Sequence, residues 1–273
     1  MAFIKGRKQS LKAAGGFTLI ELLVVISILG VLAAVVVLNV VGFIGAGHNE
    51  AKAVELKHVA TAAGCYLVDG NPITSATTVG PGNPGIVAGY LTGDLKYYWS
   101  IDQNGSVHEL LFANALNGLD GFTSVSGGWT SGPGGLSSNG VAGSLMATGG
   151  NWSDFTLQTT ATFTSADSYG MYYRSAGDAS SGYVLQFDPA QHAFVVRKIV
   201  GGVESAPIAT MNMPAGFSGQ HSISVSVSGN THTVTVGSAT MTFNDSTYGS
   251  GTVGLQSAAG SNVNFTGFTV SPP

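Results

Sequence analysis

The feature that most constrains this chain is a long uncharged stretch close to its N-terminus. From Leu22 to Gly47 the sequence has no Asp, Glu, Lys or Arg, and most residues are apolar. About 20 helical residues span a bilayer core about 30 Å thick, so the stretch is long enough to cross one. It is too long for the apolar region of an ordinary secretory signal, which has about 7–15 residues. The stretch therefore predicts a helix surrounded by lipid or by other helices.

Charge is distributed unevenly around this stretch. Residues 1–16 contain four basic residues and no acid, whereas the rest of the chain has six Lys and Arg against fourteen Asp and Glu, a formal charge of −8. Basic residues beside an apolar helix stay on the cytoplasmic side, so the basic head predicts an orientation in the membrane. The acidic remainder argues against nucleic-acid binding. Glu21 lies at the start of the apolar run, where an unpaired carboxylate is costly.

The helix is expected to continue beyond the uncharged stretch. After Gly47, apolar residues such as Val54, Val59 and Ala63 recur at three- and four-residue spacings with charged residues between them. That spacing is typical of an amphipathic helix. We therefore expect one helix over residues 17–68, with a transmembrane or filament-core part over residues 17–47.

These N-terminal residues resemble a known family. A basic leader, then Gly16-Phe17, Thr18-Leu19, Ile20-Glu21 and a long apolar run, is similar to the signal of type IV pilins and type II secretion pseudopilins. The resemblance implies that prepilin peptidase cuts between Gly16 and Phe17 and that Phe17 is then N-methylated. It also implies insertion in the cytoplasmic membrane, followed by assembly into an extracellular filament of identical or related subunits. A pilus assembly ATPase and its platform proteins are the further partners implied.

Glu21 corresponds to the glutamate that this family uses in assembly, and a physical reason supports that role. Cleavage leaves a cationic amine at Phe17 in apolar surroundings, where opposite charges are tolerated when they are paired. We expect Glu21 of one chain to contact the Phe17 amine of a neighbour and to set the axial register. One departure is Leu38, where many pilins have a proline that promotes local melting of the helix.

Residues 69–118 are expected to form a small pilin-type loop and sheet packed on the helix. Pro72, Pro81 and Pro84, with glycines between them, predict an irregular connection. The two apolar runs of "YYWSIDQNGSVHELL" flank Asn104-Gly105, which is a strong signal for a hairpin.

Residues 119–273 are rich in Gly, Ser and Thr and contain a series of short alternating runs. In "HSISVSVSG", Ile223, Val225 and Val227 share one face and the serines share the other. Such a series predicts a β-sandwich or jelly roll. The order of the runs resembles concanavalin A-like jelly rolls of the laminin-G and glycoside-hydrolase-related kind. The predicted fold class is thus α+β: a long helix with a small sheet, then an all-β sandwich displayed outside the filament.

Little in the sequence supports catalysis. The seven acids of residues 119–273 are scattered singly, whereas retaining glycosidases need two carboxylates about 5–5.5 Å apart. We found no Gly-x-Ser-x-Gly elbow and no His pair spaced for a metal. We therefore expect no enzyme, no catalytic residue, no bound metal and no cofactor. Asp167, Asp178 and Asp188 could supply oxygen ligands for calcium, but they match no calcium-loop signature.

Binding of an extracellular glycan is the alternative role for the sandwich. Sugar sites combine an aromatic surface with a few polar groups. On "GMYYR", alternation places Met171 and Tyr173 on one face and Tyr172 and Arg174 on the other, so one pair is core and the other lines a surface. The candidate ligand-binding residues are Trp152, Tyr172, Arg174 and Tyr183.

Three functions remain open from the sequence. The chain could be a structural subunit of a type IV pilus-like filament, a minor or tip pilin that binds carbohydrate, or a pseudopilin of a type II secretion system. Abundance in sheared filaments separates the first two. Loss of enzyme secretion on deletion, without surface filaments, identifies the third.

The mature N-terminus is the most direct check on the family. Mass spectrometry of surface filaments is expected to find a chain that begins at N-methylated Phe17, because Gly16-Phe17 is the predicted cleavage point. A chain that begins after Ala34, as an ordinary secretory cleavage would produce, contradicts this prediction.

Overall fold

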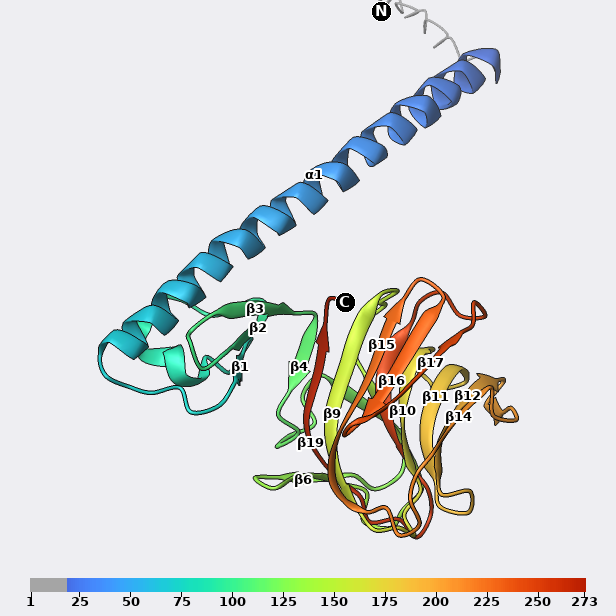
Figure 1. Cartoon of the computed structure of the whole chain (residues 1–273). Coiled ribbons are helices and arrows are strands. Elements are labelled where there is room, and N and C mark those ends of the chain that lie inside the picture. Colours follow the sequence, from blue (N-terminus) through green and yellow to red (C-terminus); the bar gives the residue numbers. More distant parts are fainter. Residues whose placement is uncertain (1–18) are drawn as a thin grey trace, which may run out of the picture. The chain divides into compact units, whose positions relative to one another are not determined.

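The structure, a computed structural model, describes residues 19–273, except for the side chains of residues 30–46 and 48. The predicted leader, its cleavage point Gly16-Phe17 and the predicted helix start at residue 17 lie outside the described residues. The chain divides into two compact units, Met1–Val54 and Glu55–Pro273. Helix α1 (Leu19–Val68) runs from the first unit into the second (Figure 1).

The start of α1 is apolar on all sides. Glu21 lies in its first turn, and the large apolar side chains from Leu19 to Leu29 are 46–78% exposed. A contiguous exposed apolar surface marks a contact with a membrane or with protein. In the part of α1 whose side chains are described, no stretch is long and apolar enough to cross a membrane. The predicted transmembrane and filament-core segment, residues 17–47, is only partly covered by that description and stays a prediction.

In the second unit, the end of α1 packs on a small antiparallel sheet. Val59, Ala62 and Ala63 of the helix share a buried core with Trp99 and Ile101 of the sheet. The elements are β1 (Thr77–Val79), the 3-10 helix η1 (Gly85–Tyr90), β2 (Tyr98–Ile101) and β3 (Val107–Leu110), and the strands pair in the order β1-β2-β3.

The β2–β3 hairpin turns at the Asn-Gly pair, as the sequence predicts. Asp102 Oδ1 accepts hydrogen bonds from the backbone N of Ser106 (2.8 Å) and of Asn104 (2.9 Å). The hydrogen bond from Ser106 is the main cause that holds the pKa of Asp102 below its ordinary value. Gly105 has a φ of 81°, a conformation that glycine adopts without strain.

Strand β3 runs almost directly into the sandwich. Only Leu111 separates it from β4 (Phe112–Asn114), and the backbone N of Leu111 donates a hydrogen bond to the O of Val270 at 2.6 Å. Strand β4 pairs with the last strand, β19 (Asn264–Ser271). The strand pairing of the sandwich therefore includes residues before 119, and the predicted division into domains 69–118 and 119–273 stays a prediction.

The remaining strands form two antiparallel sheets that face each other (Figure 1). The β10 sheet has the order β13-β12-β11-β10-β18-β8-β5, with β14 paired to β12, and the β9 sheet has the order β17-β16-β15-β9-β19-β7-β6, with β4 paired to β19. The strands of the β10 sheet are β5 (Phe122–Ser126), β8 (Gly143–Ala147), β10 (Tyr169–Ser175), β11 (Ser181–Asp188), β12 (Ala193–Val200), β13 (Val203–Glu204), β14 (Ala209–Asn212) and β18 (Thr252–Ser257). Those of the β9 sheet, besides β4 and β19, are β6 (Thr130–Gly132), β7 (Gly135–Ser137), β9 (Phe155–Phe163), β15 (Gly219–Ser228), β16 (Thr231–Val236) and β17 (Ala239–Asn244).

One aromatic-rich core lies between the two sheets. Phe163 of β9 lies with its ring centroid 4.8 Å from that of Tyr169 and 5.2 Å from that of Phe187, both on the facing sheet. Along β15, buried valines and Ile223 alternate with more exposed serines, as the sequence predicts. The predicted α+β fold, a helix and small sheet followed by an all-β jelly-roll sandwich, is confirmed.

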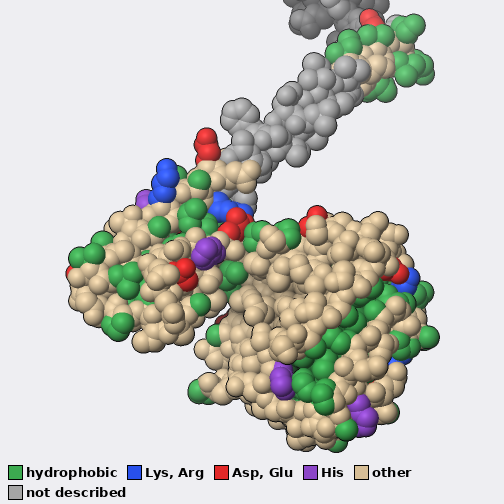
Figure 2. Space-filling view, in the orientation of Figure 1, with side chains coloured by type: hydrophobic (Ala, Val, Ile, Leu, Met, Phe, Trp, Pro, Cys, Tyr) green, Lys and Arg blue, Asp and Glu red, His purple; other side chains and the backbone are tan. Residues whose placement is uncertain are grey.

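The outer face of the β9 sheet carries mainly hydroxyl groups. Cross-strand hydrogen bonds join Thr156 to Ser226 (3.0 Å) and Thr235 to Thr240 (3.1 Å). In the space-filling view, the sandwich surface is largely drawn in tan, the colour of the backbone and of side chains that are neither hydrophobic nor charged (Figure 2). Such pairs stabilise the sheet modestly and keep the face hydrated, which accounts for the Ser- and Thr-rich composition of this part of the chain.

Glu55 joins the end of α1 to the small sheet. Its Oε1 accepts hydrogen bonds from Trp99 Nε1 (2.8 Å) and from the backbone N of Tyr97 (3.0 Å), and its Oε2 accepts one from the backbone N of Lys96 (2.9 Å). Three donors are therefore satisfied by one carboxylate, and an ionised acceptor makes these bonds stronger than neutral ones.

Replacing this carboxylate is expected to loosen the helix from the sheet. Glu55→Gln places an amide NH₂ against the donors and should lower the free energy of unfolding by about 1–2 kcal/mol. Urea unfolding of the mature chain in detergent, followed by tryptophan fluorescence, measures the change. Glu50→Gln, an exposed position of the same helix, is the matched control, and equal midpoints for the two variants would contradict the prediction.

Candidate functional site

The outer face of the β10 sheet carries a group of polar side chains. Leu185 and Leu255 point into the core, so the next residues, Gln186 and Gln256, point to the opposite face because side chains alternate along a strand. Strand β10 lies between them, and its Gly170 pairs with Gln186 on one side and with Gln256 on the other. These two glutamines, with three charged residues nearby, form the sheet-face cluster: Gln186, Asp188, Arg197, Glu204 and Gln256.

Glu204 is the centre of the sheet-face cluster. Its Oε1 accepts hydrogen bonds from Gln186 Nε2 (2.7 Å) and Gln256 Nε2 (2.9 Å), and the two glutamines are also joined to each other (2.7 Å). Glu204 lies on β13, so the β12–β13 hairpin brings this carboxylate to strands that are distant in the sequence. Its side chain is 34% exposed and is therefore accessible to a ligand.

Gly170 leaves the space that the cluster needs. A Cβ at this position would lie 2.5 Å from the O of Leu185 and 3.1 Å from both Gln186 Cγ and Gln256 Oε1. A backbone oxygen cannot move away as a flexible side chain can, so a larger residue would disturb the sheet. The missing side chain allows the two glutamines to meet across β10.

Arg197 orients the other side of the cluster. Its Nε donates to Gln186 Oε1 (3.1 Å), its Nη2 to Asp188 Oδ2 (3.2 Å) and its Nη1 to the backbone O of Ser205 (3.1 Å). Glu204 Oε2 lies 3.9 Å from Arg197 Nε. One guanidinium thus holds two carboxylates, and the cluster carries a formal charge of −1.

This arrangement suits a ligand with several hydroxyl groups. Carboxylate oxygens accept hydrogen bonds, and Arg197 uses three of the five N–H groups of its guanidinium within the chain, so adjacent sugar hydroxyls find partners of both kinds. The groups lie on paired strands rather than on loops, which keeps them in fixed positions. The formal charge of −1 disfavours an acidic ligand. The cluster is therefore chemically suited to a neutral carbohydrate.

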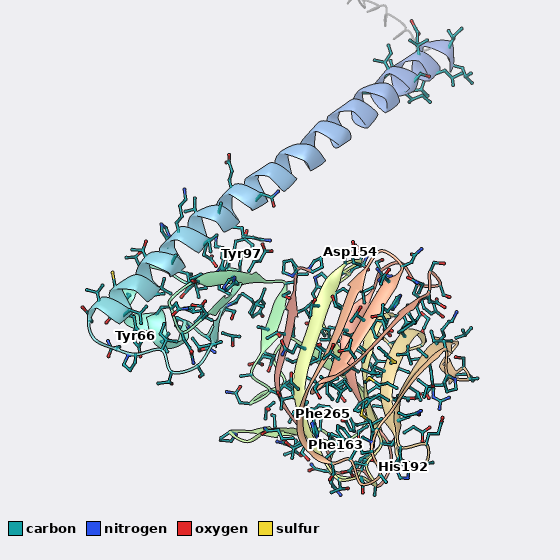
Figure 3. All side chains as sticks on the ribbon, in the orientation of Figure 1. Tyr66, Tyr97, Asp154, Phe163, His192 and Phe265 are labelled. Carbon is teal, nitrogen blue, oxygen red and sulfur yellow. The ribbon has the colours of Figure 1, made fainter. Side chains whose placement is uncertain are left out.

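The predicted site residue Arg174 has a structural role at one end of the sandwich. Its side chain is buried, and its guanidinium donates to the backbone O of Ser153 (2.6 and 2.8 Å), of Gly229 (2.8 Å) and of Tyr248 (3.1 Å). Its Nη2 also lies 3.2 Å from Asp154 Oδ1. Asp154 immediately precedes β9, and Figure 3 shows it at the opposite end of that strand from Phe163. Arg174 thus ties three loops together.

A β-bulge explains why the predicted alternation fails at Arg174. The register with β18 shifts between Tyr172 and Ser175, and Arg174 has a φ of 42°. A bulge inserts one extra residue and redirects the side chains that follow. Tyr172 therefore faces the outer side, as expected, but Arg174 is directed to loops of the facing sheet instead of sharing that side.

Tyr172 and Trp152 are also less exposed than residues of an open binding surface would be. Tyr172 is 4% exposed and packs with Met146, Val184 and Ile199, and its hydroxyl forms a 2.8 Å hydrogen bond with Ser144. Trp152 is half-buried against the core. The assignment of Trp152, Tyr172, Arg174 and Tyr183 to ligand binding stays a prediction, as does the role of Glu21 in assembly.

Tyr183 is fully buried and is hydrogen-bonded to Asp245. Its hydroxyl donates to Asp245 Oδ1 at 2.6 Å, and burial together with this bond raises the pKa of Tyr183 to about 12. Burial opposes ionisation of Asp245, but hydrogen bonds from Lys198, Thr247 and Tyr183 outweigh it and hold the pKa of Asp245 well below its ordinary value. The pair stabilises the same end of the sandwich as Arg174.

His232 completes this buried network. Its Nε2 lies 3.0 Å from the backbone O of Asp245 and its Nδ1 lies 3.2 Å from the hydroxyl of Tyr173. A carbonyl accepts but cannot donate, so Nε2 carries the hydrogen and Nδ1 accepts from the tyrosine. The neutral imidazole satisfies both contacts. Burial is the main cause that lowers the pKa of His232.

Sequence reasoning missed the sheet-face cluster, although a signal was present. In "YVLQF" and "TVGLQS" a glutamine interrupts an otherwise apolar strand at an outward position. A polar residue in an inner strand is informative, because neighbouring strands cover it on both sides. The sequence did not show that the two strands flank Gly170. Among the described residues, no group of His, Cys, Asp and Glu side chains gathers as a metal site would need, and Asp167, Asp178 and Asp188 form none.

Two family models match the chain. Residues 109–271 match the 3-keto-alpha-glucoside-1,2-lyase-like domain, and residues 11–37 match the prokaryotic N-terminal methylation motif. The second match confirms the pilin-type signal that the N-terminal residues predict. No curated protein matches the chain.

Several solved structures are similar to the sandwich. A carbohydrate binding module from Bacillus subtilis has a TM-score of 0.50 and 22% identity, and the match covers 55% of this chain and 95% of that one. A protein of unknown function with a galectin-like fold from Bacillus subtilis has a TM-score of 0.47 and 13% identity, with coverage of 60% and 96%. A beta-glucanase from Bacillus licheniformis has a TM-score of 0.45 and 10% identity, with coverage of 59% and 98%. The first of these likenesses supports the jelly-roll fold.

The buried histidine predicts a pH dependence of stability. Because the pKa of His232 is lower in the folded chain than its ordinary value near 6.5, its contribution is complete above pH 6.5 and is lost as pH falls through the folded pKa. Asp245 loses its contribution only at lower pH, below its ordinary pKa of 3.8. The thermal midpoint of the sandwich should therefore fall between pH 7 and pH 5, and it should fall less in His232→Gln. His58→Gln, an exposed histidine of α1, should behave as the wild type, and parallel pH curves for all three proteins would refute the prediction.

Proposed function

The chain belongs, through residues 109–271, to the 3-keto-alpha-glucoside-1,2-lyase-like domain family. From this membership and from the methylation motif of residues 11–37, we propose that the chain is a pilin-like subunit whose sandwich binds carbohydrate. Prepilin peptidase would cleave the precursor at Gly16-Phe17 in the cytoplasmic membrane. The mature subunit would then assemble into an extracellular filament through α1 and display the sandwich on the outside.

One observation carries this proposal: the methylation motif and the carbohydrate-related domain are parts of one chain. The motif covers residues 11–37 and overlaps α1, whose apolar side chains from Leu19 to Leu29 are exposed on all sides. Such a surface needs lipid or neighbouring helices around it. A filament of packed helices supplies those neighbours and leaves the C-terminal sandwich accessible.

Assembly is proposed to depend on Glu21. A carboxylate in the first turn of a helix is favoured by the helix dipole, and Glu21 lies in the first turn of α1. The amine that cleavage creates at Phe17 is the partner we propose for it on a neighbouring subunit. This ion pair would fix the axial register, whereas apolar contacts between helices would provide most of the stability.

The sheet-face cluster is the proposed carbohydrate site. Glu204, Gln186 and Gln256 form a fixed set of hydrogen-bonding groups on the outer face of a sheet. Among solved structures with the same fold, one is named as a carbohydrate binding module. Neutral glycans are the proposed ligands in preference to acidic ones, because a cluster with a formal charge of −1 repels an acidic ligand.

Binding rather than turnover is proposed despite the name of the family. General acid–base chemistry needs two groups positioned at different atoms of the substrate. Here both carboxylates of the cluster contact the same guanidinium, Arg197, and Glu204 Oε1 already accepts two hydrogen bonds. The arrangement holds hydrogen-bond partners in place and does not separate an acid from a base.

The cluster favours an adhesive subunit over the two alternatives. A purely structural pilin gains nothing from Gly170 and two interlocked glutamines on an outward face, whereas an adhesin needs such a surface. Whether the subunit is major or minor follows from its abundance in sheared filaments. A pseudopilin role would appear as loss of enzyme secretion on deletion.

Filaments sheared from cells that express variants test both parts of the proposal. Glu21→Gln should leave the chain in the membrane fraction and absent from filaments, because the neutral amide cannot pair with the Phe17 amine. Glu204→Ala should assemble normally but bind a glycan array at least about tenfold more weakly, which corresponds to about 1.4 kcal/mol. Electron microscopy and array binding are the readouts.

A matched control separates a local effect from general damage. Glu50→Gln, an exposed residue of α1, should assemble and bind as the wild type does. Normal filaments from Glu21→Gln would remove the register role, and unchanged glycan binding by Glu204→Ala would remove the sheet-face cluster as the site.

A further inference from the structure

A second feature, a pocket at the Arg174 end of the β10 sheet, is not part of the sheet-face cluster. Its volume is about 560 Å³, and it is lined by the ends of β8, β10 and β18 and by the loops next to them. Sites for small molecules have volumes of about 300–1,000 Å³. The pocket is therefore large enough for one sugar unit.

The lining of this pocket contains no acidic residue, although the chain as a whole is acidic. No carboxylate lines it, and Arg174 is the one charged residue among those that do. The guanidinium of Arg174 already donates to three backbone carbonyls and to Asp154. A cation therefore has no carboxylate to pair with in the lining. An anion would meet only Arg174, whose guanidinium is already hydrogen-bonded within the chain.

Three hydroxyl groups of the lining already donate their hydrogen within the chain. Thr148 donates to the O of Gly121 (3.0 Å), Thr252 donates to the O of Ala147 (2.8 Å) and Ser175 donates to the O of Ser181 (2.8 Å). Thr252 and Ser175 are buried, whereas Thr148 is exposed, as are Thr123, Asn151 and Ser250 of the same lining. A hydroxyl has one hydrogen but two lone pairs, so the exposed Thr148 can still accept a bond, and the other exposed side chains add uncharged donors and acceptors. The hydroxyls of a neutral sugar match such a lining without a charge.

The walls of the pocket are held in place before any ligand binds. Arg174 joins the loop before β9 to the loop before β18 through the carbonyls of Ser153 and Tyr248. At Gly251, a Cβ would lie 2.4 Å from the backbone C of Arg174 and 2.5 Å from the N of Ser175, so the chain passes there in close contact. Preformed walls reduce the entropy lost on binding.

The pocket and the sheet-face cluster are separated by an apolar group. Tyr172, Val184 and Ile199 pack with Met146 on the outer face, and Tyr172 lies two residues along β10 from Gly170. Next to this apolar group, the β12–β13 hairpin is hydrogen-bonded to the β10–β11 loop. The backbone N of Gly202 donates to the backbone O of Ser180 (2.8 Å). A ligand in the pocket would therefore not contact Glu204.

We propose that this pocket is a second carbohydrate site that binds a single neutral sugar unit through the hydroxyl groups of that sugar. It acts independently of the sheet-face cluster. Two sites on one domain would allow a subunit to hold two glycan chains, or two points of one chain, which raises the effective affinity for a polysaccharide.

Obstructing variants test the pocket in a chain whose other site has been removed. Gly177 lines the pocket, and a Cβ there meets no atom within 4 Å and needs no unusual backbone angle. Gly177→Leu should therefore fold and fill the space, and Ser250→Leu places a second obstruction on another loop of the lining. Gly93→Leu, which is equally open and does not line the pocket, is the control.

The measurement is saturation-transfer NMR on the full mature chain in detergent, carrying Glu204→Ala. The probes are methyl glucoside, methyl galactoside and methyl mannoside, with methyl glucuronide and glucosamine as charged counterparts. At least one neutral glycoside should give a signal that Gly177→Leu and Ser250→Leu each reduce about fivefold or more, because each obstruction prevents binding in the pocket. Gly93→Leu should leave the signal unchanged.

Each other result overturns the proposal. A signal that survives both obstructions places the sugar elsewhere, and a stronger signal from a charged probe refutes the neutral ligand class. Absence of a signal from every neutral glycoside refutes the site itself. None of these results bears on the sheet-face cluster, because every sample lacks Glu204 and the glycan array tests that cluster separately.

Discussion

The sandwich depends on the insertion of its last strand, β19, between β9 and the first strands of the domain. One edge of β19 pairs with β9, and the other pairs with β4 and β7. Phe265 and Phe268 both reach the core although they are three residues apart, because a bulge at Gly267, with a φ of 62°, restores the alternation. Since β4 follows β3 after a single residue, this strand also attaches the small sheet on α1 to the sandwich.

A second bulge determines what each face of the β10 sheet can do. It directs Arg174 to the loops of the facing sheet, where a buried guanidinium satisfies carbonyls from three loops. A buried charge is tolerated when its hydrogen bonds are complete. Arg174 therefore does not lie on the outer face. On that face, Gln186 and Gln256 meet beside Gly170. The bulge at Arg174 thus places the hydrogen bonds of this arginine away from the sheet-face cluster that we propose for binding.

The chain combines two surfaces with opposite requirements. The start of α1 exposes apolar side chains that must be covered by lipid or by neighbouring helices. The sandwich exposes hydroxyls and amides that remain in water, and few of its charges are basic. The filament that we propose would satisfy both, because it would bury the helices along its axis and keep the polar domains in solvent on its outside. Glu55 joins the second part of α1 to the small sheet.

The sequence by itself determined the architecture, and the tertiary structure decided the site. The Gly16-Phe17 junction, the uncharged run after Glu21 and the alternating strands are local patterns, and local patterns follow from helix and strand periodicity. The sheet-face cluster could not be predicted in this way. Gln186, Glu204 and Gln256 meet only because strand order and a hairpin bring them together, and single-chain periodicity contains no information on which strands become neighbours. The same limit applies to Arg174, because a bulge is set by pairing with β18 and reverses the face that alternation predicts.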